Sequence, residues 1–232
     1  LFRSTFRDSG GLWEEYDVKK VAHKGALENN RTQTLEFYDK RRLELERKEP
    51  NKAHKVLANL KKSYPDDIAI ITQNVDNLFE KAGLDHNDVI HLHGYLTNVE
   101  CEECRLVYDI GYSKCSEAFN GKCPDCYSKK VRPFIVMFGE KAPNYRVLND
   151  KIKDCELLIV IGTSGNVIDV SFIAKLIPNS ILNNLEKSVA IDESLFTKVY
   201  YDKATKAIDN IEKDIISYIT NKKLDRKSTR LN

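Results

Sequence analysis

Apolar residues recur in two patterns along this chain: short runs rich in branched side chains, and longer segments with helical spacing. The runs Ile68–Thr72 and Leu157–Ile161 have the length and composition of strands buried in a parallel sheet. Residues 204–220 place isoleucines three or four positions apart, which predicts a terminal helix with one apolar side. Because strand-like and helix-like segments alternate, the sequence predicts an α/β fold with a parallel sheet.

Helix formers and helix breakers locate further elements. Thr34–Glu49 is rich in strong helix formers, and Pro50 follows it as a helix breaker. Asn51 then stands at the start of the next apolar pattern, where its side chain suits an N-cap. We also expect helices over residues 145–155 and 166–177, and strands over residues 131–138, 180–183 and 198–201.

Residues 96–130 interrupt this alternation with turns, cysteines and few long apolar segments. They predict a small module inserted into a main domain that comprises residues 1–95 and 131–222. The last stretch, residues 223–232, is polar and aperiodic, so we expect a disordered tail there.

The composition is that of a soluble globular protein. Of the 232 residues, 41% are hydrophobic and 31% are charged, and the longest apolar runs are too short to span a bilayer. A net charge of +2 predicts no strong attraction to nucleic acid or to a membrane surface. Six cysteines, four of them in close pairs, favour a reducing compartment over a disulfide-linked scaffold.

The four paired cysteines are the strongest chemical signal in the chain. They follow the spacing C-x2-C, 18 residues, C-x2-C, and are Cys101, Cys104, Cys123 and Cys126. Each pair can offer two thiolates from one tight turn, which suits tetrahedral zinc better than an accidental pairing of reduced thiols. Four thiolates leave no coordination position open, so we predict one structural zinc ion that stabilises the inserted module.

Just upstream lies the segment His91-Leu92-His93-Gly94. The two histidines alternate, so in a strand both would face the same way. Gly94 would allow a close approach of the backbone beside His93. An imidazole with a pKa near the working pH suits general-base catalysis, which makes His93 a candidate base, although a lone histidine is more often structural.

Polar clusters follow both buried strands. Gln73–Asp76 follows the first and Gly162–Gly165 the second, and ligands of parallel sheets bind beyond the carboxyl ends of strands. The Gly162-Thr163-Ser164 turn could hold a phosphate at the N-terminus of the expected next helix, or it could simply cap that helix. The dinucleotide fingerprint G-x-G-x-x-G is absent.

Tyr38 and Arg41 are three residues apart on a predicted helix and share one side of it. A tyrosine hydroxyl beside a guanidinium could bind a carboxylate. Taken alone, the pair is better interpreted as part of a solvated basic helix, because lysines and arginines surround it.

In this order, these motifs resemble the sirtuin family of NAD-dependent protein-lysine deacylases. The resemblance covers roughly residues 4–220. It rests on Thr5-Phe6-Arg7, Gly10-Gly11-Leu12-Trp13, Thr72-Gln73-Asn74-Val75-Asp76, Leu92-His93-Gly94, the four cysteines, Arg132-Pro133, Val136-Met137-Phe138-Gly139-Glu140, Gly162-Thr163-Ser164 and Asn184-Leu185-Glu186.

The resemblance implies a Rossmann-like NAD-binding domain, a smaller zinc module and an acyl-lysine peptide in the cleft between them. His93 would accept a proton from the ribose during acyl transfer, which releases nicotinamide and O-acyl-ADP-ribose. The resemblance implies that NAD is contacted by Phe6 and Arg7 in a mobile loop, and by Gln73, Asn74, Asp76, Gly162, Thr163, Ser164, Asn184, Glu186 and Ala204.

The peptide groove would be formed by Val136, Phe138, Gly139 and Glu140, where an extended substrate could add as a strand. Tyr38 and Arg41 resemble the Tyr-x-x-Arg signature of the branch that accepts acidic acyl groups. In this context the functional interpretation is favoured, and the pair would bind the distal carboxylate of succinyl-, malonyl- or glutaryl-lysine.

One part of the family pattern has no counterpart, since Leu1–Ser4 stands where the first strand and a Gly-Ala-Gly-x-Ser loop would be. We therefore expect an N-terminally truncated chain. The compact length and the short zinc insert suggest a bacterial, cytoplasmic deacylase, which we expect to be a monomer. Two alternatives stay open: a catalytically impaired module that binds NAD or peptide, and an NAD-dependent ADP-ribosyltransferase. A zinc ribbon that binds nucleic acid is disfavoured by the low net charge.

Overall fold

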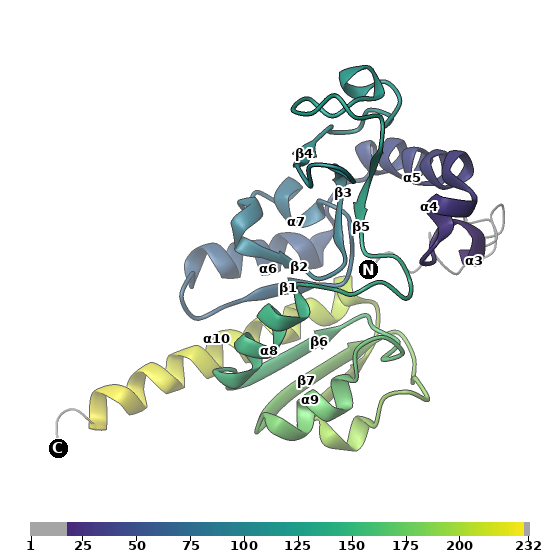
Figure 1. Ribbon diagram of the computed structural model, residues 1–232. Helices are drawn as coiled ribbons and strands as arrows, with labels where there is room; N and C mark the ends of the chain where they lie inside the picture. The colour runs from purple at the N-terminus through teal and green to yellow at the C-terminus, as the bar shows by residue number, and fades with distance from the viewer. Residues whose placement is uncertain (1–17, 230–232) are drawn as a thin grey trace.

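The computed structural model describes the backbone of residues 18–229 and the side chains of residues 20–224. Its main body contains two parallel sheets, shown in Figure 1. The larger sheet has the order β6-β7-β8, and the smaller one pairs β1 with β2. Their bounds are β1 Ile70–Thr72, β2 Val89–His91, β6 Leu157–Ile161, β7 Asn179–Asn184 and β8 Lys198–Tyr201. The predicted α/β class with parallel strands is thus confirmed.

The larger sheet is covered by helices on both faces, as a parallel sheet requires. On one side, β7 packs against α6 (Lys52–Ser63) and α10 (Ala204–Thr229), where Ile208 and Ile211 are fully buried. On the other side, α9 (Val170–Leu176) contributes to a core that includes Val160 and Leu182. Each large aliphatic side chain buried in this way contributes about 1.5–3 kcal/mol to folding.

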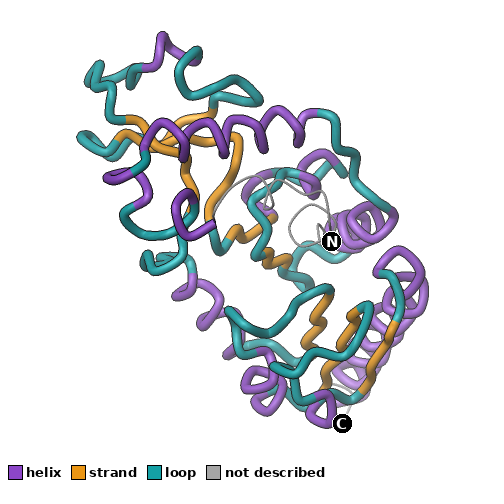
Figure 2. The backbone as a smooth tube through the Cα atoms, turned by 90° about the vertical axis from the view of Figure 1, so that its right-hand side faces the viewer, coloured by secondary structure: helices purple, strands orange, loops and turns teal. Residues whose placement is uncertain are grey.

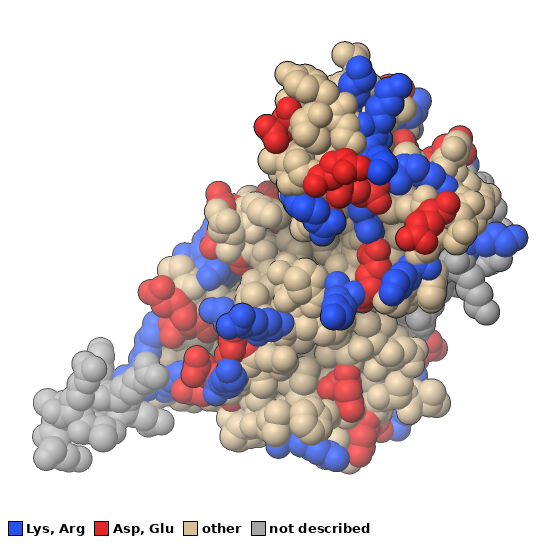
Figure 3. Space-filling view, viewed as in Figure 1, with Lys and Arg blue, Asp and Glu red and all other residues tan. Residues whose placement is uncertain are grey.

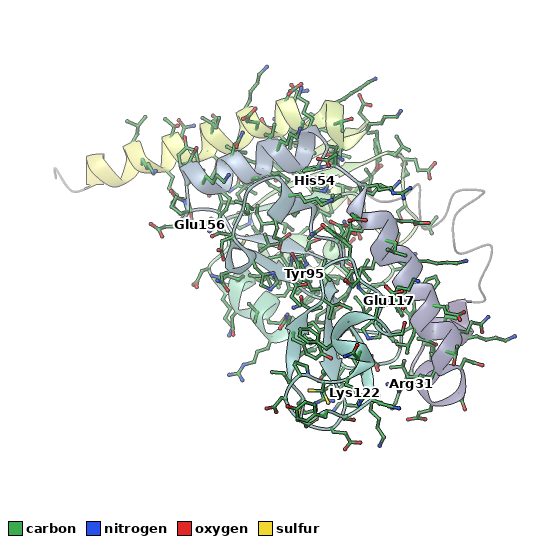
Figure 4. All side chains as sticks on the ribbon, turned by 90° about the horizontal axis from the view of Figure 1, so that it is seen from above. Arg31, His54, Tyr95, Glu117, Lys122 and Glu156 are labelled. Carbon is green, nitrogen blue, oxygen red and sulfur yellow. The ribbon has the colours of Figure 1, made fainter. Side chains whose placement is uncertain are left out.

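The start of α6 confirms the predicted cap. The Asn51 side-chain oxygen accepts hydrogen bonds from the backbone N–H groups of Ala53 at 2.9 Å and His54 at 3.2 Å. The His54 ring in turn accepts from the Asn51 N–H, which completes a capping box. Figure 4 labels His54 on this helix, beside the long helix α10.

Helix α10 extends further than predicted. Its backbone stays helical to Thr229, so it includes residues 223–229 of the segment for which we expected a disordered tail. These residues lack glycine and proline, and most of them are strong helix formers, so the preceding turns propagate through them. Figure 1 shows this end of the helix projecting away from the body of the protein.

A third sheet, which is antiparallel and has the order β4-β3-β5, forms the upper part of the molecule in Figure 1. Its strands are β3 Gly94–Cys101, β4 Val107–Asp109 and β5 Val131–Ile135. Helix α5 (Arg31–Glu46) contacts both β3 and β5. The sheet therefore begins before residue 96 and ends after residue 130, which were the predicted limits of the insert. Figure 2 shows the strands in these separate groups.

The remaining elements connect these layers. They are α3 Val18–Val21, α4 Ala26–Asn29, α7 Leu78–Lys81, α8 Tyr145–Lys153, and the short 3-10 turns η1 His86–Asp88, η2 Ala118–Gly121 and η3 Glu193–Leu195. Among the helices the structure describes, none combines the length and the apolar character needed to cross a bilayer. Leu1–Ser4 lies outside the described residues.

Candidate active site

The carboxyl ends of three parallel strands meet at one place, although β1 and β6 belong to separate sheets. The Gln73 side-chain amide, just after β1, donates to the Thr163 hydroxyl after β6 at 3.5 Å. The Asn184 amide at the end of β7 donates to the Thr163 carbonyl oxygen at 2.9 Å. The structure thus brings the two predicted polar clusters together, as expected for the ligand-binding edge of a parallel sheet.

The Gly162–Gly165 turn does not lie at a helix N-terminus. Helix α9 begins only at Val170, and the Asp169 carboxylate caps it by accepting from the Phe172 N–H at 2.9 Å. The turn is therefore separated from the helix N-terminus that the sequence suggested, and its contact with a cofactor phosphate stays a prediction. The motif does not cap the helix either: the Thr163 hydroxyl accepts from the Gly165 N–H at 3.2 Å within its own turn.

His93 is held in one orientation by two hydrogen bonds. Its Nδ1 lies 2.9 Å from the Gln73 carbonyl oxygen, which can only accept, so Nδ1 carries the proton. Its Nε2 is then free to accept from the Tyr145 hydroxyl at 2.9 Å. Burial lowers the pKa of His93, which outweighs the opposite effect of the bond to Gln73. The result is a neutral imidazole that presents a basic nitrogen.

Tyr145 is a site residue that the sequence did not reveal. It is the first residue of α8, and 52 positions separate it from His93. No motif surrounds it, and only the tertiary fold brings the two side chains together. The histidines also differ from expectation, because β2 ends at His91 and the two rings have different partners.

Gly94 confirms the predicted close approach of the backbone. Its φ is +90°, and a Cβ there would lie 2.1 Å from the Phe134 carbonyl oxygen. At this close approach, the His93 carbonyl oxygen accepts from the Val136 N–H at 2.9 Å, just after β5.

We expect Gly94→Ala to lower the free energy of unfolding by about 2–4 kcal/mol, because it combines overpacking with a left-handed backbone. Denaturant unfolding would measure the change. Gly111→Ala is the matched control, since Gly111 has a φ of +57° but no atom within 4 Å of its added Cβ. Equal losses in both variants would contradict the steric explanation.

A cavity of about 1750 Å³ opens beside His93 and continues between β1 and β6. This volume exceeds the ~300–1,000 Å³ of an ordinary small-molecule pocket, so it can hold an extended ligand or two ligands together. Besides His93, the predicted site residues that line it are Tyr38, Arg41, Gln73, Asn74, Val136, Phe138, Gly139, Glu140, Gly162, Thr163, Ser164, Asn184, Glu186 and Ala204.

Among the described residues, one predicted cofactor contact does not line this cavity. Asp76 is not among the lining residues, and its carboxylate accepts from the Leu78 N–H at 3.1 Å at the start of α7. Burial raises the pKa of Asp76. Phe6 and Arg7, predicted to cover the cofactor, lie outside the described residues.

Tyr38 and Arg41 face the cavity rather than bulk solvent. Tyr38 is only 4% exposed, and burial raises the pKa of its hydroxyl to about 12. Burial lowers the pKa of Arg41 to about 10, against the opposing charge effect of Tyr38, so the guanidinium remains charged at neutral pH. The interpretation of this pair as a solvated basic surface therefore does not hold.

The neighbouring Arg42 has a different role. Its side chain is fully buried and donates to the Asp39 carboxylate at 2.5 Å and to the Leu96 carbonyl oxygen at 2.8 Å. These bonds join α5 to β3 and satisfy a buried charge. Arg42 thus stabilises the fold, whereas Arg41 lines the cavity.

The segment Val136–Glu140 is more constrained than predicted. Phe138 donates its N–H to the Ala22 carbonyl oxygen at 2.9 Å, and its own carbonyl oxygen accepts from the Lys24 N–H at 2.7 Å. An added substrate strand therefore cannot pair with Phe138. Glu140 is also engaged, since Arg132 forms two hydrogen bonds to its carboxylate at 2.8 and 2.9 Å. Among the described residues, the backbone oxygen of Val136 and the backbone of Gly139 have no such partners.

The four paired cysteines converge as their spacing predicts. Their sulfur atoms all lie within 4.8 Å of one another, with Cys101 and Cys126 3.5 Å apart and Cys104 and Cys123 3.6 Å apart. A tetrahedral site with Zn–S bonds of about 2.3 Å has sulfur atoms about 3.8 Å apart. The four thiols thus fit one structural zinc ion with little rearrangement.

Comparison with known proteins places this fold and site in a family. The Sir2 family profile matches residues 4–169. The NAD-dependent protein deacylase of Campylobacter jejuni subsp. jejuni serotype O:2 is 43% identical over 215 residues, which cover 93% of this chain and 90% of that protein. The chain therefore belongs to the Sir2 family, and the resemblance drawn from its motifs is confirmed.

Solved structures agree with this assignment. A Sir2 homologue in complex with NAD superimposes with a TM-score of 0.76 at 27% identity, covering 92% of this chain and 83% of the homologue. A Sir2 protein bound to an acetylated peptide gives a TM-score of 0.70 at 25% identity, covering 86% and 84% of the two chains. This chain is thus an enzyme of a family whose members use NAD.

Proposed function

We propose that this protein removes acyl groups from lysine side chains in an NAD-dependent reaction, and that it favours acyl groups ending in a carboxylate. The observation that carries the proposal is the shared cavity, which is lined by His93, by Tyr38 and Arg41, and by the polar ends of β1, β6 and β7. Its size accommodates both a dinucleotide and an acylated side chain.

The two cofactors have separate places in this proposal. Gln73, Asn74, Thr163 and Asn184 would hold NAD, and their polar groups already converge at the carboxyl ends of the strands. The four cysteines would hold zinc within the module of residues 96–130. The parts of the chain at 1–95 and 131–222 would form the NAD-binding domain, with the peptide between it and the module.

His93 is the residue we assign to proton transfer. When NAD is bound, it supplies the ADP-ribosyl group that accepts the acyl group as nicotinamide leaves. The hydrogen bond to Gln73 fixes the imidazole tautomer, so Nε2 can take a proton from a ribose hydroxyl. The Tyr145 hydroxyl donates to this nitrogen, and that hydrogen bond must break before the ribose hydroxyl can donate to Nε2.

The preference for acidic acyl groups follows from the electrostatics of the Tyr38 and Arg41 pair. Burial weakens the hydration of the guanidinium, as the lowered pKa of Arg41 indicates. A substrate carboxylate would form a strong, charge-assisted hydrogen bond with this guanidinium in a site of low dielectric constant. The neutral hydroxyl of Tyr38 could donate a further hydrogen bond to the same carboxylate.

We expect Arg41→Met to reduce kcat/KM for succinyl-lysine peptides by at least ~10-fold while deacetylation changes much less. The loss corresponds to a charged hydrogen bond worth about 1.5–3 kcal/mol. The measurement compares two peptides that differ only in the acyl group.

Arg47→Met is the matched control, because Arg47 also belongs to this helical region but is exposed and does not line the cavity. It should leave the ratio of the two activities unchanged. Equal loss of desuccinylation and deacetylation in Arg41→Met would refute a selective role for Arg41.

A further inference from the structure

A second group of metal-binding side chains lies outside the cysteine quartet. It consists of Glu80 from α7, His86 from η1 and His91 at the end of β2, whose ligand atoms lie within 4.8 Å of one another. Asp85 caps η1 by accepting from the Asn87 N–H at 2.9 Å. This tight turn folds the chain back, so the ring of His86 stacks on that of His91 at a centroid distance of 5.7 Å.

The contacts of His91 leave a place for a proton or a metal ion between its ring and Glu80. Its Nδ1 lies 3.3 Å from the Asn74 carbonyl oxygen, which can only accept, so Nδ1 carries a proton. Its Nε2 lies 2.9 Å from Oε1 of Glu80. A neutral imidazole would direct a lone pair at the carboxylate, so a proton or a metal ion must lie between them.

The geometry suits a metal ion as well as a proton. Nδ1 of His86 is 3.5 Å from the same Glu80 oxygen, so a second nitrogen donor faces the same point. Zinc bonds of about 2.0–2.2 Å to nitrogen and oxygen place tetrahedral ligand atoms about 3.3 Å apart. The observed separations of 2.9 and 3.5 Å bracket this value. The bond from His91 to Asn74 is the outer contact that commonly orients a metal-binding histidine.

Burial and access favour the same conclusion. The side chains of His91 and Glu80 are 5% and 14% exposed, whereas that of His86 is 55% exposed. The second Glu80 oxygen, Oε2, is buried and accepts no hydrogen bond from the part of the chain that the structure describes. A bound cation would compensate for this unpaired atom. The exposed side at His86 leaves an entry path and room for a water ligand.

The aromatic ring packed against the two imidazoles carries no charge of its own. The Tyr95 ring contacts both imidazoles edge-on, at centroid distances of 4.5 Å from His86 and 4.6 Å from His91. Figure 4 labels Tyr95 near the centre of the molecule. On the face drawn in Figure 3, acidic and basic residues are interspersed.

We propose that Glu80, His86 and His91 form a second metal site, which takes a divalent transition metal ion of the zinc type with water as a further ligand. Two neutral imidazoles and one carboxylate are a common ligand set for such ions. The site is independent of the cysteines and of the acyl preference, and it lies on the segment that joins α7 to the catalytic histidine.

Titration of Co²⁺ into the full chain, already loaded with one zinc ion, tests this proposal. Cobalt at a nitrogen and oxygen site shows visible d–d absorption, whereas cobalt at the cysteines would add an intense sulfur-to-metal charge-transfer band. We expect one further equivalent of Co²⁺ to bind with visible d–d absorption and without the charge-transfer band. His86→Ala and Glu80→Gln should each weaken this binding by at least ~10-fold.

His23→Ala is the matched control, because His23 is exposed and lies outside the cluster. It should bind the second equivalent as the unaltered chain does. Retention of the first zinc ion would show that each variant is folded. Absence of a second Co²⁺ site in the unaltered chain, unchanged binding in His86→Ala, or binding seen only with the charge-transfer band would overturn the proposal.

Discussion

His93→Ala is expected to reduce the rate of deacylation by ~10²–10⁴-fold, the usual contribution of a general base. The imidazole is placed for this role by the bond from Nδ1 to Gln73, which leaves Nε2 as the basic nitrogen. Single-turnover assays with an acylated peptide and NAD would measure the loss. Unfolding curves should show that the variant remains folded.

The pH dependence provides a second measure of the same group. Because burial lowers the pKa of His93, the base is already neutral at neutral pH. We expect kcat/KM to stay level there and to decline only below about pH 6.5, the ordinary histidine pKa. Tyr145→Phe is a useful comparison, because it keeps His93 and removes only the hydroxyl that donates to Nε2 of His93.

A decrease in the deacylation rate of less than ~10-fold in His93→Ala would contradict the assignment of His93 as the general base.

Cys123→Ser is expected to abolish stoichiometric zinc binding and to unfold the small module. Cys123 is fully buried among the four sulfur atoms, so no other thiol can replace it. Structural zinc contributes about 10–16 kcal/mol of binding free energy in small domains, and that energy is coupled to folding. Metal analysis, proteolysis of residues 96–130 and circular dichroism would follow the change.

Cys155→Ser is the matched control, because Cys155 lies outside the quartet and donates to the Leu157 carbonyl oxygen at 3.3 Å. It should keep one zinc ion per chain. Cys101 is the last residue of β3 in the β4-β3-β5 sheet, so loss of zinc should also reduce activity by displacing the Val136–Glu140 segment that follows β5. Full zinc content and unchanged unfolding in Cys123→Ser would rule out a metal centre at these cysteines.

The sequence predicted those structural features that depend only on residues close together in the chain. The run Leu157–Ile161 forms β6 with the predicted limits, because a short apolar run rich in β-branched residues favours a strand, although only Val160 in it is buried. Asn51 caps α6 as predicted, since the cap depends on atoms within three residues. The cysteine spacing likewise encodes two tight turns, and the fold needs only to bring the two pairs together.

Features that depend on distant parts of the chain were not predictable. Nothing near Tyr145 signals its contact with His93, which arises where the start of α8 meets the end of β2 and the Asn144 amide donates to the His91 carbonyl oxygen at 2.7 Å. The pairing of Phe138 with Ala22 and Lys24 similarly joins segments more than a hundred residues apart. The Gly162–Gly165 turn was placed at a helix terminus because sequence patterns locate helix ends poorly, and Asp169 supplies the cap instead.

The most direct test of the proposed function compares two substrates in one experiment. The purified chain would be incubated with NAD and with peptides that carry either succinyl-lysine or acetyl-lysine, and the products would be identified by mass spectrometry. We predict faster removal of the succinyl group, with nicotinamide and O-succinyl-ADP-ribose as products. Equal or faster deacetylation would contradict the role of Tyr38 and Arg41, and transfer of ADP-ribose to protein without deacylation would contradict the reaction itself.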